Sequence, residues 1–154
     1  MISLIVAYSR NNKVIGINNT IPWHIKEDFL HFKNYTTNKT IVMGEQTFLS
    51  IGKPLPNRHT IVINSSKDFD TMGQELCTDL NEVINKYKDR EEVVFVVGGA
   101  SIYRQMLPYV NEMVISVVKK EYVGNIYFPE YEDEFYTYDE VEYDEFTVKY
   151  MRRK

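Results

Sequence analysis

The chain has 154 residues, of which 44% are hydrophobic and 26% charged, and its formal net charge is −4 at pH 7. This length predicts one domain, residues 1–154, that buries roughly 70% of the surface exposed by the unfolded chain. The negative charge argues against a general nucleic-acid binder, and the single cysteine, Cys77, rules out an internal disulfide and predicts a reducing, cytoplasmic location.

Short apolar or β-branched runs predict strands at residues 2–7, 40–43, 60–63, 93–97 and 113–118. The first run is too short for a membrane span and lacks the basic flank of a signal peptide. Helical patterns occupy residues 25–35, residues 80–88 with Asp79 as N-cap, and residues 101–107, where Pro108 ends the helix. Strands that alternate with helices predict a mostly parallel sheet covered on both faces.

The C-terminal part differs, because residues 130–145 carry nine acidic residues interleaved with tyrosines. Alternating apolar positions at 136–141 and 146–150 predict an antiparallel hairpin at the edge of the sheet. We interpret the acidic stretch as a solvated face whose charges protect that edge. Near the N-terminus, residues 9–23 form a long segment with little periodicity, which favours a mobile flap over a plain surface connection.

Asp28 is the most informative single residue. On a helix it lies on the same face as Ile25, Phe29 and Phe32, and a carboxylate on an apolar face is costly unless it is paired. It is either a structural carboxylate bonded to backbone or a group that awaits a ligand with hydrogen-bond donors. In a cleft its pKa would be raised, and it would take part in proton transfer.

Two glycine-containing turns follow predicted strands, at Gly44 and at Gly98-Gly99. Such turns expose free backbone N–H groups to phosphate oxygens, and two of them indicate a ligand with a pyrophosphate, such as a dinucleotide. Neither has the three spaced glycines of the standard dinucleotide motif. Between them, the proline-rich turn at residues 51–57 presents Arg58, which either grips a ligand carboxylate or forms a surface ion pair. The three histidines lack metal-ligand spacing, so no metal is expected.

In this order, these features resemble the dihydrofolate reductase family. The resemblance covers nearly the whole chain, and the bacterial short form is the closer likeness in length. Its most specific parts are Val14-Ile15-Gly16, Pro22-Trp23 with Asp28, Met43-Gly44 with Thr47, Gly52-Lys53-Pro54-Leu55-Pro56 with Arg58, Val97-Gly98-Gly99 with Tyr103, and Tyr127-Phe128-Pro129.

The resemblance implies an α/β fold with a twisted eight-stranded, mostly parallel sheet, an antiparallel C-terminal strand and four flanking helices. It implies hydride transfer from NADPH to C6 of 7,8-dihydrofolate with protonation at N5, a cytoplasmic monomer that serves one-carbon metabolism, and binding of antifolate inhibitors. No nucleic acid or membrane is expected as a partner. The bond between Gly98 and Gly99 is expected to be cis.

The resemblance also implies roles for individual residues. Asp28 would bind the pterin and promote N5 protonation, with Ser116 beside it where the family usually has threonine. Arg58 would hold the glutamate α-carboxylate of the substrate. The other substrate-binding residues would be Ile5, Ala7, Phe32, Ile51 and Leu55. Trp23 and Tyr103 would lie at the reacting rings. The cofactor-binding set would be Ala7, Ile15, Gly16, Gly44, Gln46, Thr47, Ser65, Val97, Gly98, Gly99, Ala100, Ser101, Ile102 and Tyr103.

The chain departs from the family pattern at two places. Glu45 and Ser101 stand where arginines are common near the 2′-phosphate of NADPH, which predicts weaker discrimination against NADH, with Ser65 and Lys67 left as phosphate partners. Asn125 and Ile126 stand where aspartate and threonine are frequent, which predicts a less firmly held flap. Two alternatives stay open: a reductase of another pterin or pyrimidine, as in riboflavin biosynthesis, and a catalytically silent nucleotide- or folate-binding module.

Overall fold

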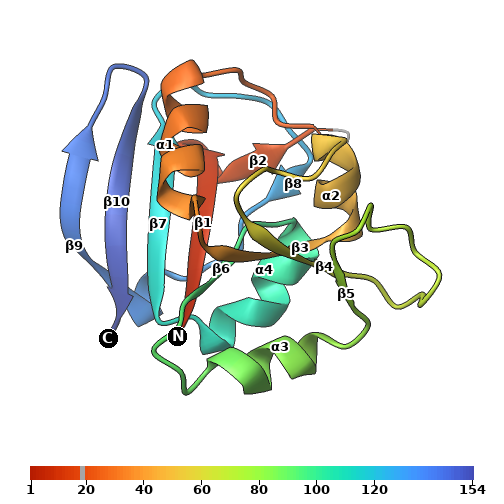
Figure 1. Cartoon of the computed structure of the whole chain (residues 1–154). Helices are drawn as coiled ribbons and strands as arrows, with labels where there is room; N and C mark the ends of the chain where they lie inside the picture. The colour runs from red at the N-terminus through yellow and green to blue at the C-terminus, as the bar shows by residue number, and fades with distance from the viewer. Residues whose placement is uncertain (18–19) are drawn as a thin grey trace.

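The structure is a computed structural model that describes residues 1–17 and 20–154. Its centre is an eight-stranded sheet in the order β5-β4-β3-β6-β1-β7-β10-β9 (Figure 1). Neighbours from β5 to β7 pair in parallel, whereas β10 is antiparallel to both β7 and β9. The strands are β1 Ile2–Ser9, β3 Thr40–Gly44, β4 His59–Ile63, β5 Glu75–Cys77, β6 Val94–Val96, β7 Glu112–Val118, β9 Phe135–Glu142 and β10 Phe146–Arg153.

Four α-helices connect the strands: α1 Lys26–Thr36, α2 Glu45–Ile51, α3 Leu80–Tyr87 and α4 Ala100–Met106. Hydrophobic residues of α1 and α2 pack against one face of the sheet, and those of α3 and α4 against the other. The predicted fold class is therefore confirmed, including the antiparallel C-terminal strand and the four helices.

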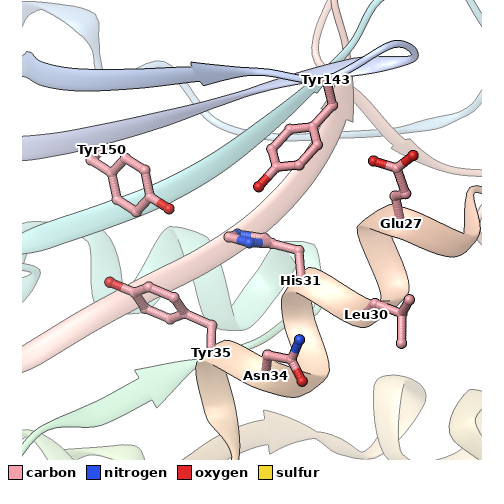
Figure 2. Close-up of a pocket in the computed structure, with 7 residues that line it drawn as sticks. All are labelled: Glu27, Leu30, His31, Asn34, Tyr35, Tyr143 and Tyr150. Carbon is pink, nitrogen blue, oxygen red and sulfur yellow. The ribbon is translucent and has the colours of Figure 1, made fainter.

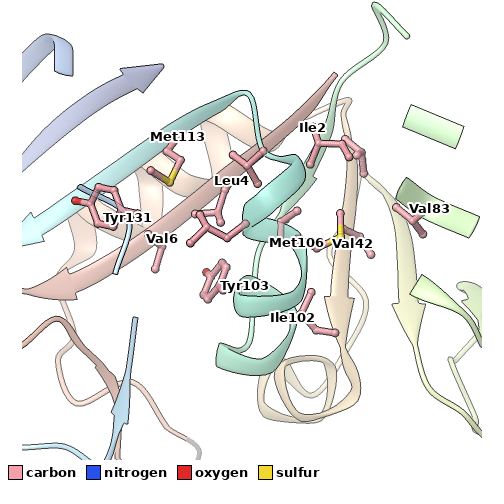
Figure 3. Close-up of a cluster of buried hydrophobic side chains, with 14 of the residues drawn as sticks. Ile2, Leu4, Val6, Val42, Val83, Ile102, Tyr103, Met106, Met113 and Tyr131 are labelled. Atoms are coloured by element: carbon pink, nitrogen blue, oxygen red, sulfur yellow. The ribbon is translucent and has the colours of Figure 1, made fainter. Parts of the chain in front are cut away.

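The alternation of side chains along β1 explains why the sheet has two cores. Successive residues of a strand point to opposite faces, so Leu4 and Val6 join the cluster under α3 and α4, whereas Ile5 joins the cluster under α1 and α2. Figure 3 shows the first cluster, where Ile102 and Met106 of α4 lie among these strand residues. A strand that is buried on both faces needs a continuous apolar run, as residues 2–6 provide apart from Ser3.

The predicted C-terminal hairpin is confirmed, with β9 as the edge strand beside β10 (Figure 1). After buried Phe135, every residue of β9 is exposed. Its acidic side chains therefore face solvent on the unpaired edge, in agreement with the interpretation of this stretch as a charged, protected edge.

Three short strands were not predicted. β5 has three residues, and β2 (Val14–Gly16) pairs with β8 (Ile126–Tyr127) in a separate two-stranded sheet. Strands this short carry too little alternation to be recognised in a sequence. The helix predicted over residues 101–107 is α4, Ala100–Met106, which ends before Pro108 and continues into a 3-10 turn, Leu107–Tyr109. Among the described residues, no helix is both long and apolar enough to cross a membrane.

Candidate active site

The two glycine-containing turns meet at the carboxyl ends of adjacent parallel strands. Gly44 ends β3, and Gly98-Gly99 follows β6, which pairs with β3. The amide of Gly44 donates to the carbonyl oxygen of Gly98 at 2.9 Å, and the bond between Gly98 and Gly99 is cis, as expected. In open α/β sheets this edge is where ligands bind.

The turns are tight enough to require glycine. Gly98 has a φ of +130°, and a Cβ atom there would lie 3.1 Å from Oγ1 of Thr47. A Cβ at Gly44 would lie 3.0 Å from Cγ1 of Ile102, closer than ordinary van der Waals contact. Both Gly44 and Gly98 are buried, so a side chain at either position would have to displace its neighbour.

These turns suit the phosphates of a dinucleotide. Gly44 is the N-cap of α2 and Gly99 is the N-cap of α4, and neither helix start is capped by a side chain. The first amides of both helices therefore have hydrogen-bonding capacity to offer. Thr47 lies between the two turns, while Ala100 and Ser101 begin α4. The residues present thus fit the pyrophosphate of NADPH.

Asp28 lies in the first turn of α1, and its partner comes from the sheet. The hydroxyl of Ser116 on β7 donates a hydrogen bond to its carboxylate. Burial raises the pKa of Asp28, while this hydrogen bond opposes the rise. Among the described residues, no Lys, Arg or His lies within ion-pair distance of it. Asp28 is therefore a half-buried acid without a counter-charge among the described residues.

The apolar residues predicted to line the substrate site come together in one cluster. Its buried members include Ile5 and Trp23, and its half-buried members include Ala7, Phe32, Ile51 and Leu55. They come from β1, α1, α2 and the loops beside them. Ala7 lies directly opposite Ser116 in the β1–β7 pairing, so this apolar wall adjoins the partner of Asp28.

Tyr103 connects the glycine turn to β1. Its hydroxyl donates to the carbonyl oxygen of Ile5 at 2.9 Å, in a fully buried position, and its amide donates to the carbonyl oxygen of Gly99. Burial raises the pKa of Tyr103, so the phenol stays protonated and remains a donor. The backbone of β1 is thus held against α4 beside the glycine turn.

Arg58 is held by neutral acceptors. Its Nε donates to Oγ1 of Thr36 at 2.9 Å, and its terminal nitrogens donate at 2.6 Å to the carbonyl oxygens of Lys33 and Pro56. No described carboxylate lies within ion-pair distance, so the surface ion pair is the wrong alternative. The guanidinium sits at the carboxyl end of α1, which favours a cation.

The segment 9–23 is more ordered than a plain loop. Val14 and Gly16 of β2 are buried, and the amide of Asn125 donates to the carbonyl oxygen of Gly16 at 3.0 Å. Ile15 is half-buried and packs against the cluster under α3 and α4. Trp23 is buried, and its ring lies 5.3 Å from that of Tyr122. Residues 18 and 19 of the predicted flap lie outside the described residues.

Some of the residues predicted to bind the cofactor are exposed or only half-buried. Gln46, Ser65 and Ser101 are exposed, whereas Val97, directly after β6, is half-buried. Two neighbours were missed: Asn64, whose amide donates to Glu45, and Tyr122 beside Trp23. Nothing in the sequence marks either residue, because both contacts join segments that only the fold brings together. The described part of the chain holds no group of three or more His, Cys, Asp or Glu suited to a metal ion.

A second groove lies on another face of α1, outside this site. Figure 2 shows His31 and Tyr35 of α1 opposite Tyr143 and Tyr150 of the C-terminal hairpin. Nε2 of His31 is buried and has no hydrogen-bond partner among the described residues. Burial lowers the pKa of His31, which keeps the ring neutral.

Comparisons with known proteins agree with this geometry. A protein-family model described as dihydrofolate reductase matches residues 1–151. The dihydrofolate reductase of Bacillus subtilis (strain 168) is 38% identical over 133 residues, which cover 86% of this chain and 78% of that protein. Dihydrofolate reductase type 3 of Salmonella typhimurium is 37% identical over 131 residues, with 85% and 80% covered. A structure of dihydrofolate reductase from Enterococcus faecalis, complexed with NADP(H) and RAB-propyl, superposes with a TM-score of 0.91 at 26% identity, over 99% of this chain and 96% of that one.

Proposed function

The chain belongs to the dihydrofolate reductase family, and we propose that it reduces 7,8-dihydrofolate to 5,6,7,8-tetrahydrofolate for one-carbon metabolism. When bound, NADPH supplies the hydride that adds to C6 of the substrate, and a proton adds to N5. The observation that carries this proposal is the half-buried carboxylate of Asp28, which has no counter-charge among the described residues and lies beside an apolar wall. That a cytoplasmic monomer does this work stays a prediction from the sequence.

Asp28 is proposed to anchor the pterin and to ease its protonation. An ionised carboxylate accepts hydrogen bonds from the 2-amino and N3 groups of the pterin ring. In a low-dielectric site, the same negative charge favours the protonated, cationic form of the ring over the neutral one. Asp28 then raises the basicity of N5 without touching it. The hydroxyl of Ser116 holds the carboxylate in place by the hydrogen bond already described.

The apolar wall is proposed to position the ring and exclude water. Hydride transfer needs the donor and acceptor carbons about 3–3.5 Å apart in a fixed orientation. Ile5 and Ala7 form one side on β1, with Phe32 of α1 across from them. The bond from Tyr103 to the carbonyl oxygen of Ile5 keeps β1 registered against the glycine turn that would hold the cofactor phosphates.

Arg58 is proposed to bind the α-carboxylate of the glutamate in the substrate. Its charge has no carboxylate partner among the described residues, while four neutral oxygens fix its plane. A guanidinium fixed in this way loses little freedom when it binds a carboxylate. The segment of residues 9–23, anchored by β2 on β8, is proposed to close over the reacting rings as a flap.

Mixing the purified protein with NADPH and dihydrofolate tests the function directly. We expect the near-ultraviolet absorbance of the reduced nicotinamide to fall at a rate proportional to enzyme concentration. Tetrahydrofolate should form in a one-to-one ratio with NADPH consumed. Binding of both molecules without loss of absorbance at micromolar enzyme would favour the silent binding module. Reduction of another pterin or pyrimidine in preference to dihydrofolate would favour the related reductase.

A further inference from the structure

The strand order places one half of the proposed dinucleotide site on the far side of the Gly98-Gly99 turn from Asp28. Asp28 and its apolar wall lie on the β1 and β7 side of the Gly98-Gly99 turn, whereas β4 and β5 lie on the other side. If the nicotinamide half occupies the first side, the residues left to hold the adenosine half are those that follow β4 and β5. A groove of about 450 Å³ lies there, lined among others by Ile63, Ser65, Thr78, Asp79, Leu80 and Gln105.

The charge in this region is negative. None of the residues that line the groove is a lysine or an arginine, and one, Asp79, is an acid. Glu45, the first residue of α2, lies beside the end of β4, where its carboxylate accepts a hydrogen bond from the side-chain amide of Asn64. No described cation pairs with Glu45. The nearest cation that follows β4 in the sequence is Lys67, which is exposed.

We infer that Glu45 makes this site nearly indifferent to the 2′-phosphate that distinguishes NADPH from NADH, so that the protein accepts both cofactors. The inference rests on the proposed function, since it concerns the same cofactor site. A 2′-phosphate carries a charge of about −1.5 to −2 near neutral pH and is repelled by a nearby carboxylate. A free 2′-hydroxyl can instead donate to a carboxylate, as it does in many NAD sites, whereas NADP sites supply an arginine.

A hydrogen bond from the side-chain amide of Asn64 holds the carboxylate of Glu45 in place. It fixes the carboxylate of Glu45 at the end of β4, so the charge cannot swing freely into solvent. The backbone amide of Ser66 donates to the side-chain oxygen of Asn64 at 2.8 Å, which orients the amide group toward Glu45. The pair of Glu45 and Asn64 is thus built into the turn that follows β4. Exposed Lys67 offers only a screened and mobile charge in return.

Binding of small nucleotides tests the inference without turnover. Adenosine 2′,5′-bisphosphate and adenosine 5′-monophosphate differ only in the 2′-phosphate, and calorimetry at fixed ionic strength gives both affinities. We expect the parent protein to bind the two nucleotides with affinities within about threefold of each other. We expect the same of its affinities for NADPH and NADH. Glu45→Gln should strengthen binding of the bisphosphate by roughly tenfold and Glu45→Arg by more. Neither variant should strengthen binding of the monophosphate, and Glu45→Arg should weaken it, because its 2′-hydroxyl then loses the carboxylate acceptor. Glu91→Gln, an exposed acid outside the groove, is the matched control and should change nothing.

A parent protein that binds the bisphosphate or NADPH at least a hundredfold more tightly than its counterpart would overturn the inference. So would a Glu45→Gln variant whose two nucleotide affinities equal those of the parent. Failure of the proposed function looks different. In that case dihydrofolate is not reduced with either cofactor, while the nucleotide affinities still report on Glu45.

Discussion

Asp28 and Ser116 are joined by a hydrogen bond although they belong to α1 and β7, which lie far apart in the sequence. The bond crosses from a helix face to the strand beside β1. It ties Asp28 to an interior strand of the sheet, since β7 pairs with both β1 and β10. Asp28 is therefore positioned by the fold as well as by its own helix.

Replacing Asp28 by asparagine should remove most of the activity at neutral pH. The amide would keep the size of the side chain but lose the charge that favours the protonated pterin, so we expect kcat/KM to fall by roughly 10²-fold or more. Activity should partly recover in acid, because solvent then protonates the substrate. Steady-state rates between about pH 5 and pH 9 measure this. Turnover at neutral pH equal to that of the parent would refute the role of Asp28.

The same substitution should stabilise the folded protein at neutral pH. Burial raises the pKa of Asp28 in the folded protein above its pKa in the unfolded chain. The stability that the protonated carboxyl contributes is therefore fully present below the unfolded-state pKa, and it is lost as pH rises through the folded-state pKa. An asparagine has no proton to lose, so Asp28→Asn should have a higher free energy of unfolding than the parent at about pH 7. This difference should shrink as the pH is lowered toward 4. Urea titrations at several pH values measure it. Ser116→Ala should instead destabilise the folded protein at neutral pH, because it removes the hydrogen bond that lowers the pKa of Asp28.

Arg58→Ala should weaken substrate binding more than it slows the chemistry. A charge-assisted hydrogen bond to a carboxylate contributes about 1.5–3 kcal/mol, which corresponds to a rise in KM of roughly 10- to 100-fold with kcat little changed. Dihydropteroate, which lacks the glutamate, is the matched control substrate. Parent and variant should use it equally well. A variant that loses as much efficiency with this substrate as with dihydrofolate would show that Arg58 only supports the fold.

His31→Phe should stabilise the protein. Nε2 of His31 is buried without a partner among the described residues, and an unsatisfied buried polar group costs about 1–3 kcal/mol. Burial also lowers the pKa of His31, so the unfolded chain takes up the proton first, and the parent loses stability as pH falls below the unfolded value of 6.5. The advantage of the variant should therefore grow from about pH 7 to pH 5. His24→Phe, at an exposed position just before α1, should show neither effect.

Gly124→Ala should disrupt the anchor of the proposed flap. A Cβ atom at this position would overlap the carbonyl oxygen of Gly16 and the side chain of Val14, so β8 and β2 must move apart. We expect a loss of about 1–3 kcal/mol in stability together with a lower kcat. Gly73→Ala, where φ is +85° and no atom lies near, controls for the general cost of replacing a glycine. Its kcat should equal that of the parent.

The sequence predicted those strands and helices that have a long hydrophobic pattern or are bounded by a capping or turn residue. The apolar run of β1, the N-cap Asp79 and the turn at Gly98-Gly99 each identify an element by local chemistry. β2 and β8 escaped prediction, because two or three residues show no period and their pairing is non-local. Asp28 was recognisable because an acid on an apolar face violates the local pattern.

The partners of these residues were harder to predict. The acceptors around Arg58 are the hydroxyls of Thr36 and Thr37 and two backbone carbonyls, and a sequence does not show which carbonyls will be acceptors. The pairing of Glu45 with Asn64 likewise depends on β3 lying beside β4 in register. A resemblance to a family supplies residue roles, but contacts peculiar to this chain come only from its own fold.

The placement of β1 in the sheet also has a consequence for synthesis. β1 leaves the ribosome before its partners β6 and β7, whose paired residues follow about ninety and about a hundred and ten residues later in the chain. Until then β1 is an apolar segment with both edges open, the kind of surface that favours aggregation. Long-range parallel pairing of this kind slows folding. We expect nascent chains truncated before β7 to be held by chaperones, and productive folding to wait for the last third of the chain.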